Sequence, residues 1–552
     1  MKARKTGVRT MWLCSNRSDG WYWLQVSACA VVLLTLLGCG GGAGSASGAG
    51  SDPPPVQSAT PSLTATQVDA VVHAAVQSVN VPIVVGVTDR LGNILAVFDT
   101  NGAPGTGIGN FGTTPDANNL AVALARTAAF FSNDQAPLSS RTVRYISGIH
   151  FPPGVAGTAS APLYGIENTN RGCSFNTTYL PGQSIPPATL INGTTPGLGI
   201  ITGKANIYDS EPMAVNPGGV PLFSNGTLVG GVGVVAASLA TAEYAAYSGA
   251  VGAGFGADPA APGVVVINGI AVPFVDQTTA PSGVTSGPFV GTYSLGPSPS
   301  PGPPPEGYLV GPQASAYGGL SKANVNAIVM SAINTANQTR AVIRLPIGSR
   351  AKMMIAVSDL DGTLLALYRM TDATIFSIDV AVAKSRNVIY FSSEPGLPGA
   401  YADGLPGSTD LPGIPEGTAV TNRTIGFGGQ PLFPSGIDGS NPGPFFNLYI
   451  NDTEHACTQG SQPPNPNQNG VVFFPGSLPL YRNGVLVGGL GVSGDGVDQD
   501  DFVTAAGAAL TMVTDPSDSG HGYEAPTAIR ADQIVIQNVR MPYLKFPRNP
   551  TQ

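Results

Sequence analysis

The order of apolar and polar positions predicts one series of elements that occurs twice along the chain. Apolar residues at helical spacing predict helices over residues 68–79 and 321–334, with Thr66 and Ser321 as candidate N-caps. After each helix, two apolar runs flank a glycine-containing turn, which is typical of a β-hairpin. The turns are Gly92-Asn93 and Gly362-Thr363.

The two series continue with the same predicted elements. A second helical pattern is followed by an Asn-Gly turn between apolar runs, which favours a hairpin, and then by a third helical pattern. The second helical pattern covers residues 120–131 and 378–391, and the Asn-Gly turn is at 225–226 and 483–484. The third helical pattern covers residues 242–251 and 499–511. Helix, hairpin, helix, hairpin, helix predicts an α+β fold in which helices cover an antiparallel sheet.

Matching blocks of sequence in the same order indicate that one domain has been duplicated. The pairs are 85–99 with 355–369, 125–132 with 385–392, 141–154 with 423–436, 219–234 with 477–492 and 265–274 with 534–543, besides two blocks that end at Cys173 and Cys457. We therefore assign a first copy to residues 62–276 and a second copy to residues 316–546. The segment 277–315 is rich in Pro, Gly and Ser and is expected to be a semi-rigid linker.

The N-terminus is typical of an exported lipoprotein. Basic residues precede an apolar stretch that is short for a membrane span and ends in Leu-Leu-Gly-Cys. This pattern predicts a signal peptide over residues 1–38, acylation of Cys39, and a flexible spacer over 39–61. The alternative is a simple secretory signal. The expected location is the cell envelope, with the protein anchored to the membrane, in the outer membrane if the host is Gram-negative.

Composition narrows the function classes. The 73 Gly and 50 Pro among 552 residues predict long ordered loops, and 25 Lys+Arg against 33 Asp+Glu give a net charge of −8. The acidic balance argues against a nucleic-acid partner, which needs clustered cations. Phosphate-binding loops, metal-spaced His/Cys clusters and the G-x-S-x-G elbow do not occur in the sequence.

The cysteines predict one disulfide. Cys14 and Cys29 lie in the predicted signal and Cys39 would carry lipid, which leaves Cys173 and Cys457 in the folded part. These two occupy equivalent positions of the repeat, and equivalent positions meet when two copies pack like an isologous dimer. We therefore predict a disulfide that joins the copies, with two buried free thiols as the alternative.

The second copy contains a series of short motifs in a recognisable order. They are a D-x-x-G turn at 359–362, Arg369-Met370 at a strand end, A-x-x-K at 381–384, Leu478-Pro479, and a glycine-rich strand at 488–494 followed by Gln499-Asp500. In this order they resemble the GlcG/HbpS-like haem-binding family. The first copy departs from the pattern, because Asp99 and Leu124 stand where the second copy has Arg369 and Lys384, and both copies carry a long insertion before the second hairpin.

The resemblance implies a profilin-like fold that often forms oligomers, with haem as cofactor in some members and haem degradation in at least one. It implies Arg369, Met370 and Lys384 as residues that line a ligand pocket; the alternative is that Arg369 and Lys384 are solvated ends of a strand and a helix. No CxxCH motif occurs, so a haem would not be covalently attached.

Haem needs an axial donor and cations for its propionates, and the four histidines are the first candidates. His73 lies in a helical pattern and His521 in a loop, and both are interpreted as structural. His150 follows a loop with Arg141, Arg144 and Tyr145, and His455 lies two residues before Cys457. We therefore take His150 and His455 as candidate metal ligands, and Arg141 and Tyr145 as candidate ligand-binding residues.

Other polar residues have structural interpretations. Asp89 and Asp359 precede glycine turns and are expected to accept hydrogen bonds from turn N–H groups. Glu167 and Arg171 lie in a polar loop beside Cys173, where catalysis is one interpretation and a loop closed by a disulfide is the other.

Three hypotheses of function follow. The first is an envelope-anchored protein that binds haem or a similar planar apolar ligand. The second is an accessory or assembly protein whose duplicated domain binds an envelope partner or forms a homo-oligomer. The third is a redox-linked enzyme that acts on haem or small hydroxy acids.

Overall fold

The structure is a computed structural model that describes residues 63–177, 179, 189–193, 197–201, 216–257, 264–392, 411–460, 466–510 and 522–551. The predicted signal peptide, Cys39, the spacer 39–61 and His521 lie outside these residues. Among the described helices, none is both long enough and apolar enough to span a membrane.

The first half of the described chain, residues 63–295, contains the predicted series of elements. The elements are α1 (Ala65–Gln77), β1 (Ile83–Asp89), β2 (Ile94–Thr100), η1 (Asn110–Gly112), α2 (Ala117–Phe131), α3 (Ser140–Tyr145), η2 (Ile166–Asn168), β3 (Gly219–Ser224), β4 (Thr227–Ala236), α4 (Leu239–Gly252), β5 (Val266–Ile267), β6 (Ile270–Ala271) and β7 (Gly291–Leu295). The N-cap of α1 is Thr64 rather than the predicted Thr66, because the Thr64 hydroxyl accepts the N–H of Gln67 in a capping box.

The second half, residues 307–551, repeats this series. Its elements are β8 (Gly307–Val310), α5 (Lys322–Ala336), β9 (Met354–Ser358), β10 (Leu364–Arg369), α6 (Phe376–Ser392), α8 (Asn422–Gly428), α9 (Phe446–Glu454), β11 (Ser477–Arg482), β12 (Val485–Ser493), α10 (Val497–Ala509), η4 (Thr527–Ile529), η5 (Ala531–Gln533), β13 (Val535–Ile536) and β14 (Val539–Arg540). Ser321 caps α5 as predicted.

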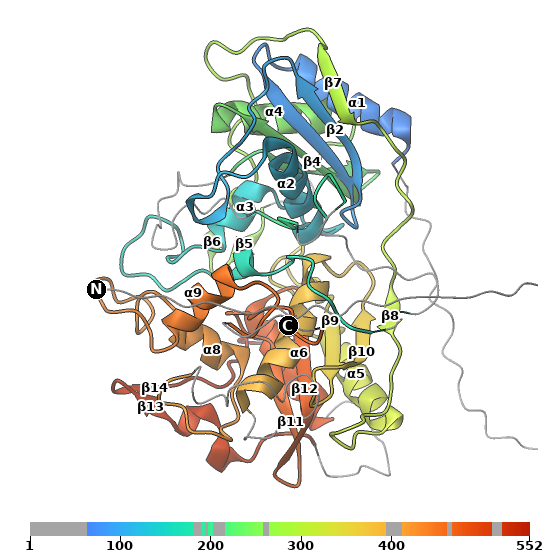
Figure 1. Cartoon of the computed structure of the whole chain (residues 1–552). Coiled ribbons are helices and arrows are strands. Elements are labelled where there is room, and N and C mark those ends of the chain that lie inside the picture. Colours follow the sequence, from blue (N-terminus) through green and yellow to red (C-terminus); the bar gives the residue numbers. More distant parts are fainter. Residues whose placement is uncertain are drawn as a thin grey trace, which may run out of the picture. The chain divides into compact units, whose positions relative to one another are not determined.

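Each half is built on a five-stranded antiparallel sheet, and the two sheets have the same topology (Figure 1). The strand orders are β3-β4-β1-β2-β7 and β11-β12-β9-β10-β8. The central pairs β1/β4 and β9/β12 run in unbroken register. The predicted α+β class, with two antiparallel sheets covered by helices, is confirmed.

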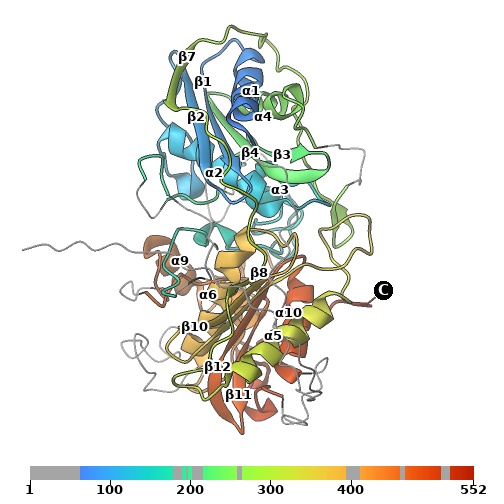
Figure 2. The same ribbon diagram turned by 90° about the vertical axis from the view of Figure 1, so that its right-hand side faces the viewer.

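Helices cover both faces of each sheet (Figure 2). In the first half α1 and α4 pack together on one face and α2 packs on the other, and in the second half α5 and α10 face α6 across the sheet. The alternation along β1 explains this arrangement, since Ile83, Val85 and Val87 join the core beneath α1 and α4 while Val84 joins the core beneath α2.

The repeated Gly-Gly-x-Gly of the last long strand brings the helix close to the sheet. A Cβ added to Gly233 would lie 1.9 Å from the Ala121 carbonyl oxygen of α2, and one added to Gly491 would lie 2.1 Å from that of Ala381 on α6. Only glycine allows the helix to approach the strand this closely, so the Gly-Gly-x-Gly motif of both halves is explained by helix–sheet packing.

The insertions before the second hairpins dock in equivalent ways. In the first half the Thr142 hydroxyl donates to the Pro273 carbonyl oxygen at 2.6 Å, and in the second half Thr424 donates to Pro542 at 2.7 Å. The N-caps Ser139 and Thr421 likewise donate to Phe274 and Tyr543. The same contacts at matched positions extend the repeat from sequence into tertiary structure.

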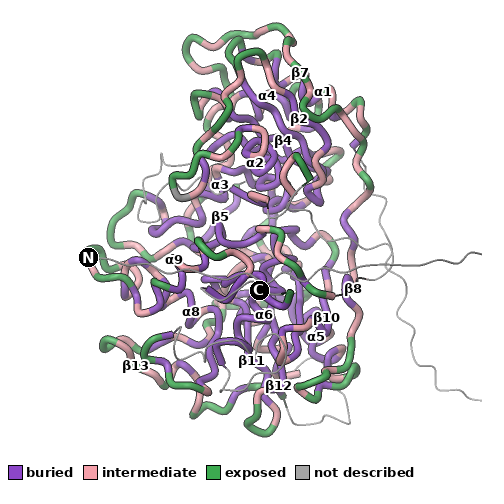
Figure 3. Tube along the Cα trace, in the orientation of Figure 1, coloured by how far each residue is buried: buried purple, intermediate pink, exposed green. Residues whose placement is uncertain are grey.

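The two halves share a hydrophobic core at their junction. One continuous cluster contains Phe130 and Ile166 of the first half together with α6 and Phe473 of the second. All residues of α6 are buried, and Figure 3 shows its tube inside the second half. Its outer side is covered jointly by residues of the first half, such as Asn170 and Phe175, and by the insertion of the second half. The predicted disulfide is confirmed, since Cys173 and Cys457 are bonded with their Cα atoms 5.2 Å apart.

The segment expected to be a linker is partly strand. β7 pairs with β2 at the edge of the first sheet, and β8 pairs with β10 at the edge of the second. Each strand is short and its residues lack a regular apolar period, so its own sequence gave little sign of the pairing. An edge strand has only one neighbour to satisfy, which relaxes the pattern it must carry.

Candidate functional site

A cavity of about 890 Å³ lies where the two halves meet. The first half contributes the ends of α2 and α3, residues 159–164 and the turn 266–269. The second half contributes residues 340–347, the starts of α6 and α10, part of α8, residues 473–475 and the C-terminal segment 542–548. The volume lies within the range of small-molecule and cofactor sites.

Aromatic side chains from both halves contribute to the cavity wall. Phe131 of α2 and Phe376 of α6 stack with ring centroids 4.1 Å apart and belong to opposite halves. Phe427, Phe473 and Phe474 line the cavity from the second half. Phe427 is the half-buried ring of these five, and each of the other four is at most 3% exposed.

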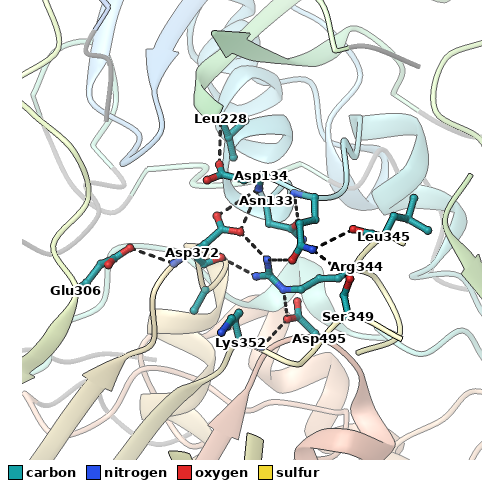
Figure 4. Close-up of polar contacts among 12 residues, drawn as sticks. Asn133, Asp134, Leu228, Glu306, Arg344, Leu345, Ser349, Lys352, Asp372 and Asp495 are labelled. Atoms are coloured by element: carbon teal, nitrogen blue, oxygen red, sulfur yellow. Dashed lines mark hydrogen bonds and ion pairs between the residues drawn. The ribbon is translucent and has the colours of Figure 1, made fainter. Parts of the chain in front are cut away.

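Arg344 also lines the cavity, but its guanidinium is already bound (Figure 4). Nε donates to Asp495, Nη1 donates to Asp372 Oδ2 at 2.5 Å, and Nη2 donates to the Asp372 carbonyl oxygen at 2.7 Å. Figure 4 shows Arg344 between the two carboxylates. A buried guanidinium held this way positions the loop that carries it.

Asp372 connects the two halves through the same network. Its carboxylate pairs with Arg90 of the first half and accepts the backbone N–H of Asp134 at 3.2 Å. Burial alone would raise the pKa of Asp372, but the guanidiniums of Arg90 and Arg344 outweigh burial and lower it. The carboxylate is therefore charged, and it ties the cavity wall to the first half.

Lys384 and Asp500 form a buried ion pair behind the cavity. Lys384 Nζ lies 3.1 Å from Asp500 Oδ2, donates to the Val492 carbonyl oxygen at 2.8 Å and lies 4.9 Å from the ring centre of Phe474. Burial lowers the pKa of Lys384 and raises that of Asp500 to about 7, and the attraction between the two opposes both shifts. Asp500 lines the cavity, and its Oδ1 accepts no hydrogen bond.

The predicted residues Arg369, Met370 and Lys384 are buried and do not line the cavity. Arg369 donates to the carbonyl oxygens of Ala373 at 2.6 Å and Pro305 at 3.2 Å, and burial lowers its pKa to about 9. The alternative interpretation, that Arg369 and Lys384 are solvated ends of elements, is wrong. Lys384 reaches the site only through Asp500 and Phe474.

The predicted residues of the first half are held by structural contacts. Arg141 forms a two-bond ion pair with Glu243 of α4, at 2.7 and 2.9 Å. Tyr145 packs edge-on against Phe151. His150 is buried, with Nδ1 2.8 Å from the Thr158 carbonyl oxygen and Nε2 3.2 Å from Asp438 of the second half. The structure does not bring these residues into the cavity.

His455 is exposed at the end of α9, and His73 stacks on Phe289 at 3.5 Å. Neither lines the cavity. Within the described ranges no group of three or more His, Cys, Asp or Glu could hold a metal ion. Among side chains that could ligate haem iron, the described cavity wall offers one tyrosine, Tyr164, and no His, Met or Cys.

The remaining polar residues have structural partners. Asp89 accepts the N–H of Asn93 at 2.9 Å, and Asp359 accepts that of Leu360 at 2.8 Å, which confirms their predicted turn role. Glu167 accepts the hydroxyl of Tyr449 at 2.7 Å, and Arg171 donates to the carbonyl oxygens of Asp452 and Thr453. These contacts favour the structural interpretation of the loop beside Cys173.

Sequence reasoning missed Arg344, Asp372 and the loop 340–347. A signal was present, because Arg344 interrupts an apolar run at 341–347 and a charge inside such a run is buried with a partner or exposed at a bend. Asp372 gave no comparable signal. Its importance depends on Arg90, which is far away in sequence.

Comparisons with known proteins give one family model and two solved structures. Residues 320–509 match the model of a family described as haem degrading protein HbpS-like. A crystal structure of Klebsiella pneumoniae protein ORFY, of family DUF336, is 16% identical with a TM-score of 0.22 and covers 35% of this chain and 90% of that one. A crystal structure described as a PduOC:Heme complex is 19% identical with a TM-score of 0.22 and covers 35% and 96%. No curated protein matches the chain.

Proposed function

We propose that the protein binds haem or a similar planar apolar ligand that carries carboxylates, in the cavity where its halves meet. The observation that carries this proposal is an aromatic cavity of about 890 Å³ beside the segment that matches the HbpS-like family model. We further propose that the first half is a divergent copy of the same domain, whose role is to complete the wall.

The residues present fit most of what a haem requires. Phe427, which is half-buried, and Phe546, which is 50% exposed, offer apolar surface for a flat ring system, and guanidinium groups at the wall suit propionates. Tyr164, which is 2% exposed and whose hydroxyl donates to the Gly429 carbonyl oxygen at 3.4 Å, would be the residue that holds the iron. Haem would supply its iron chemistry when bound, and the chain's own residues would hold and orient it.

Titration of the protein with hemin, followed at the Soret band, tests the proposal. We expect saturable binding of hemin by the unaltered protein. Val342→Trp should weaken this binding at least about tenfold, because Val342 is half-buried in the cavity wall and an indole there would fill part of the cavity. Leu360→Trp is the matched control, since Leu360 is half-buried outside the cavity. Equal hemin binding by both variants and the unaltered protein would place the ligand elsewhere.

The proposed role of Tyr164 is tested separately. Tyr164→Phe removes the hydroxyl and keeps the ring that stacks on Tyr449 at 5.1 Å. We expect the visible spectrum of the hemin complex to change while the protein keeps its stability to within about 1 kcal/mol. An unchanged spectrum would exclude Tyr164 as the iron ligand.

We also propose that the protein is exported and anchored through Cys39. The disulfide between Cys173 and Cys457 supports an oxidising compartment. Cys39→Ser is expected to abolish lipidation and membrane partitioning without changing hemin binding. Normal partitioning of this variant would overturn the anchor and leave the ligand proposal intact.

A further inference from the structure

Two arginines at the cavity wall differ from the other cations there. Arg340 begins the loop 340–347 that carries Arg344, and Arg548 lies in the C-terminal segment. Arg548 is exposed and Arg340 is half-buried. The same wall includes two exposed apolar side chains, Ile347 at 75% and Phe546 at 50% exposure, so the cavity opens to solvent.

Backbone contacts hold the two arginines side by side. The N–H of Arg340 donates to the Pro550 carbonyl oxygen at 2.6 Å, and Arg340 Nη2 lies 3.4 Å from the Arg548 carbonyl oxygen. Arg350 donates to the carbonyl oxygen of Thr551 at 3.1 Å, which fastens the end of the segment to the same loop. The cationic rim is therefore a built feature of the fold.

The other cations at the cavity already have acidic partners. Arg344 pairs with Asp372 and Asp495, Arg423 pairs with Asp498 and Asp501, and Lys545 pairs with Asp498 at 2.8 Å. Within the part of the chain that the structure describes, Arg340 and Arg548 form no ion pair with an acidic side chain. The rim thus carries two positive charges that the protein does not neutralise there.

We propose that Arg340 and Arg548 form a carboxylate-binding subsite at the mouth of the cavity, one guanidinium for each carboxylate of a dicarboxylate ligand. Guanidinium binds carboxylate through two parallel hydrogen bonds, which fixes orientation as well as position. The apolar part of the ligand then enters first and meets the aromatic wall. This subsite rests on the proposed function, since it orients the same ligand.

Among the described residues the subsite is formed in the second half alone, so we expect one ligand per chain. The connection from α1 to β1 is residues 78–82, whereas the connection from α5 to β9 is residues 337–353 and includes Arg340. At the position equivalent to Arg548, after the repeated block, the first half has Thr279. The first half therefore has neither the loop nor the cationic segment that form the rim.

Binding of hemin and of hemin dimethyl ester to the full mature protein tests this inference. Arg340→Ala and Arg548→Ala are each expected to weaken hemin binding about fivefold, as exposed ion pairs do, and the double variant about twentyfold. The dimethyl ester lacks both carboxylates, so its affinity should be the same in all these proteins. Arg540→Ala is the control, because Arg540 pairs with Asp532 away from the cavity and its loss changes net charge equally.

The outcomes separate the two proposals. Hemin affinity that is unchanged in the double variant, or an ester that loses affinity as hemin does, would overturn the subsite. A stoichiometry of two hemins per chain would overturn the single site. If the unaltered protein binds neither compound, the proposed function itself fails.

Discussion

At two equivalent helix positions, the two halves of the molecule carry different pairs of residues. In the second half Lys384 of α6 and Asp500 of α10 form a buried ion pair, and in the first half the corresponding Leu124 of α2 and Ala242 of α4 are buried in apolar clusters. Both members of the pair therefore differ between the halves. That is expected, because one charge left alone in a core costs several kcal/mol while an apolar pair costs little.

The second difference lies at the junction. The second half has the longer helix-to-strand connection, with Arg344 and its ion pairs, and the first half contributes Arg90 and Asp134 to the same network. The comparison indicates that the halves have divided their roles. The second half contains the buried ion pairs beside the cavity. The first half contributes part of the cavity wall and the contacts of Arg90 and Asp134 that hold it against the second half.

The ion pair gives the largest expected effect. Lys384→Leu alone should lower the free energy of unfolding by about 4 kcal/mol, because it leaves Asp500 buried without a partner, whereas Lys384→Leu with Asp500→Ala, the residues of the first half, should cost no more than about 1.5 kcal/mol. Urea denaturation of the three proteins measures both. Additive losses in the double variant would mean that the pair is not coupled.

The disulfide comes next. Replacing Cys173 and Cys457 by Ser should lower the free energy of unfolding by about 3 kcal/mol, less than the roughly 5 kcal/mol that loop-closure entropy assigns to a separation of 284 residues. Other contacts between the halves restrict the same loop, such as Asn170 N–H to Asp379 at 2.8 Å. Denaturation with and without reductant measures the loss, and no difference would show that packing alone holds the junction.

Two equivalent arginines offer a matched test. Arg126 and Arg386 both donate from Nε to the carbonyl oxygen of a turn glycine, at 2.8 and 2.9 Å. Arg126 also donates to the Thr189 carbonyl oxygen of its own half at 2.8 Å, whereas Arg386 donates to those of Ser174 and Phe175 in the other half. We expect Arg386→Met to cost about 3 kcal/mol and Arg126→Met about 1.5 kcal/mol. Thermal unfolding distinguishes them, and equal costs would argue that the cross-half bonds add nothing.

The smallest expected effect is a pH dependence at the junction. Asp452 is fully buried, its Oδ2 accepts no hydrogen bond, and burial raises its pKa to about 7 despite the opposing charge of Arg171. A carboxyl whose folded pKa is raised stabilises the folded state at low pH, and that contribution is lost as the pH rises from about 4 through 7.

Asp452→Asn removes this titration. The variant should therefore gain stability relative to the unaltered protein as the pH goes from 5 to 8, because its amide stays neutral throughout. Unfolding free energies at the two pH values give the comparison. A constant difference between the proteins would show that Asp452 is ionised across the range.

The sequence by itself determined the duplicated architecture. Helical spacing, Asn-Gly turns and matching blocks gave the order of elements in both halves, because these signals are local and recur at matched positions. The disulfide was also predictable, since only two cysteines remained and they occupy equivalent places in the repeat. Strands β7 and β8 were not, because an edge strand needs little pattern of its own.

Only the tertiary structure decided which polar residues meet. Periodicity places a side chain on a face of its own element, so it could single out Arg369 and Lys384 but could not show that backbone oxygens and Asp500 surround them. The cavity is formed by loops and helix ends from both halves. Its charged rim therefore depends on contacts between segments that are distant along the chain, and such contacts leave no period in the sequence.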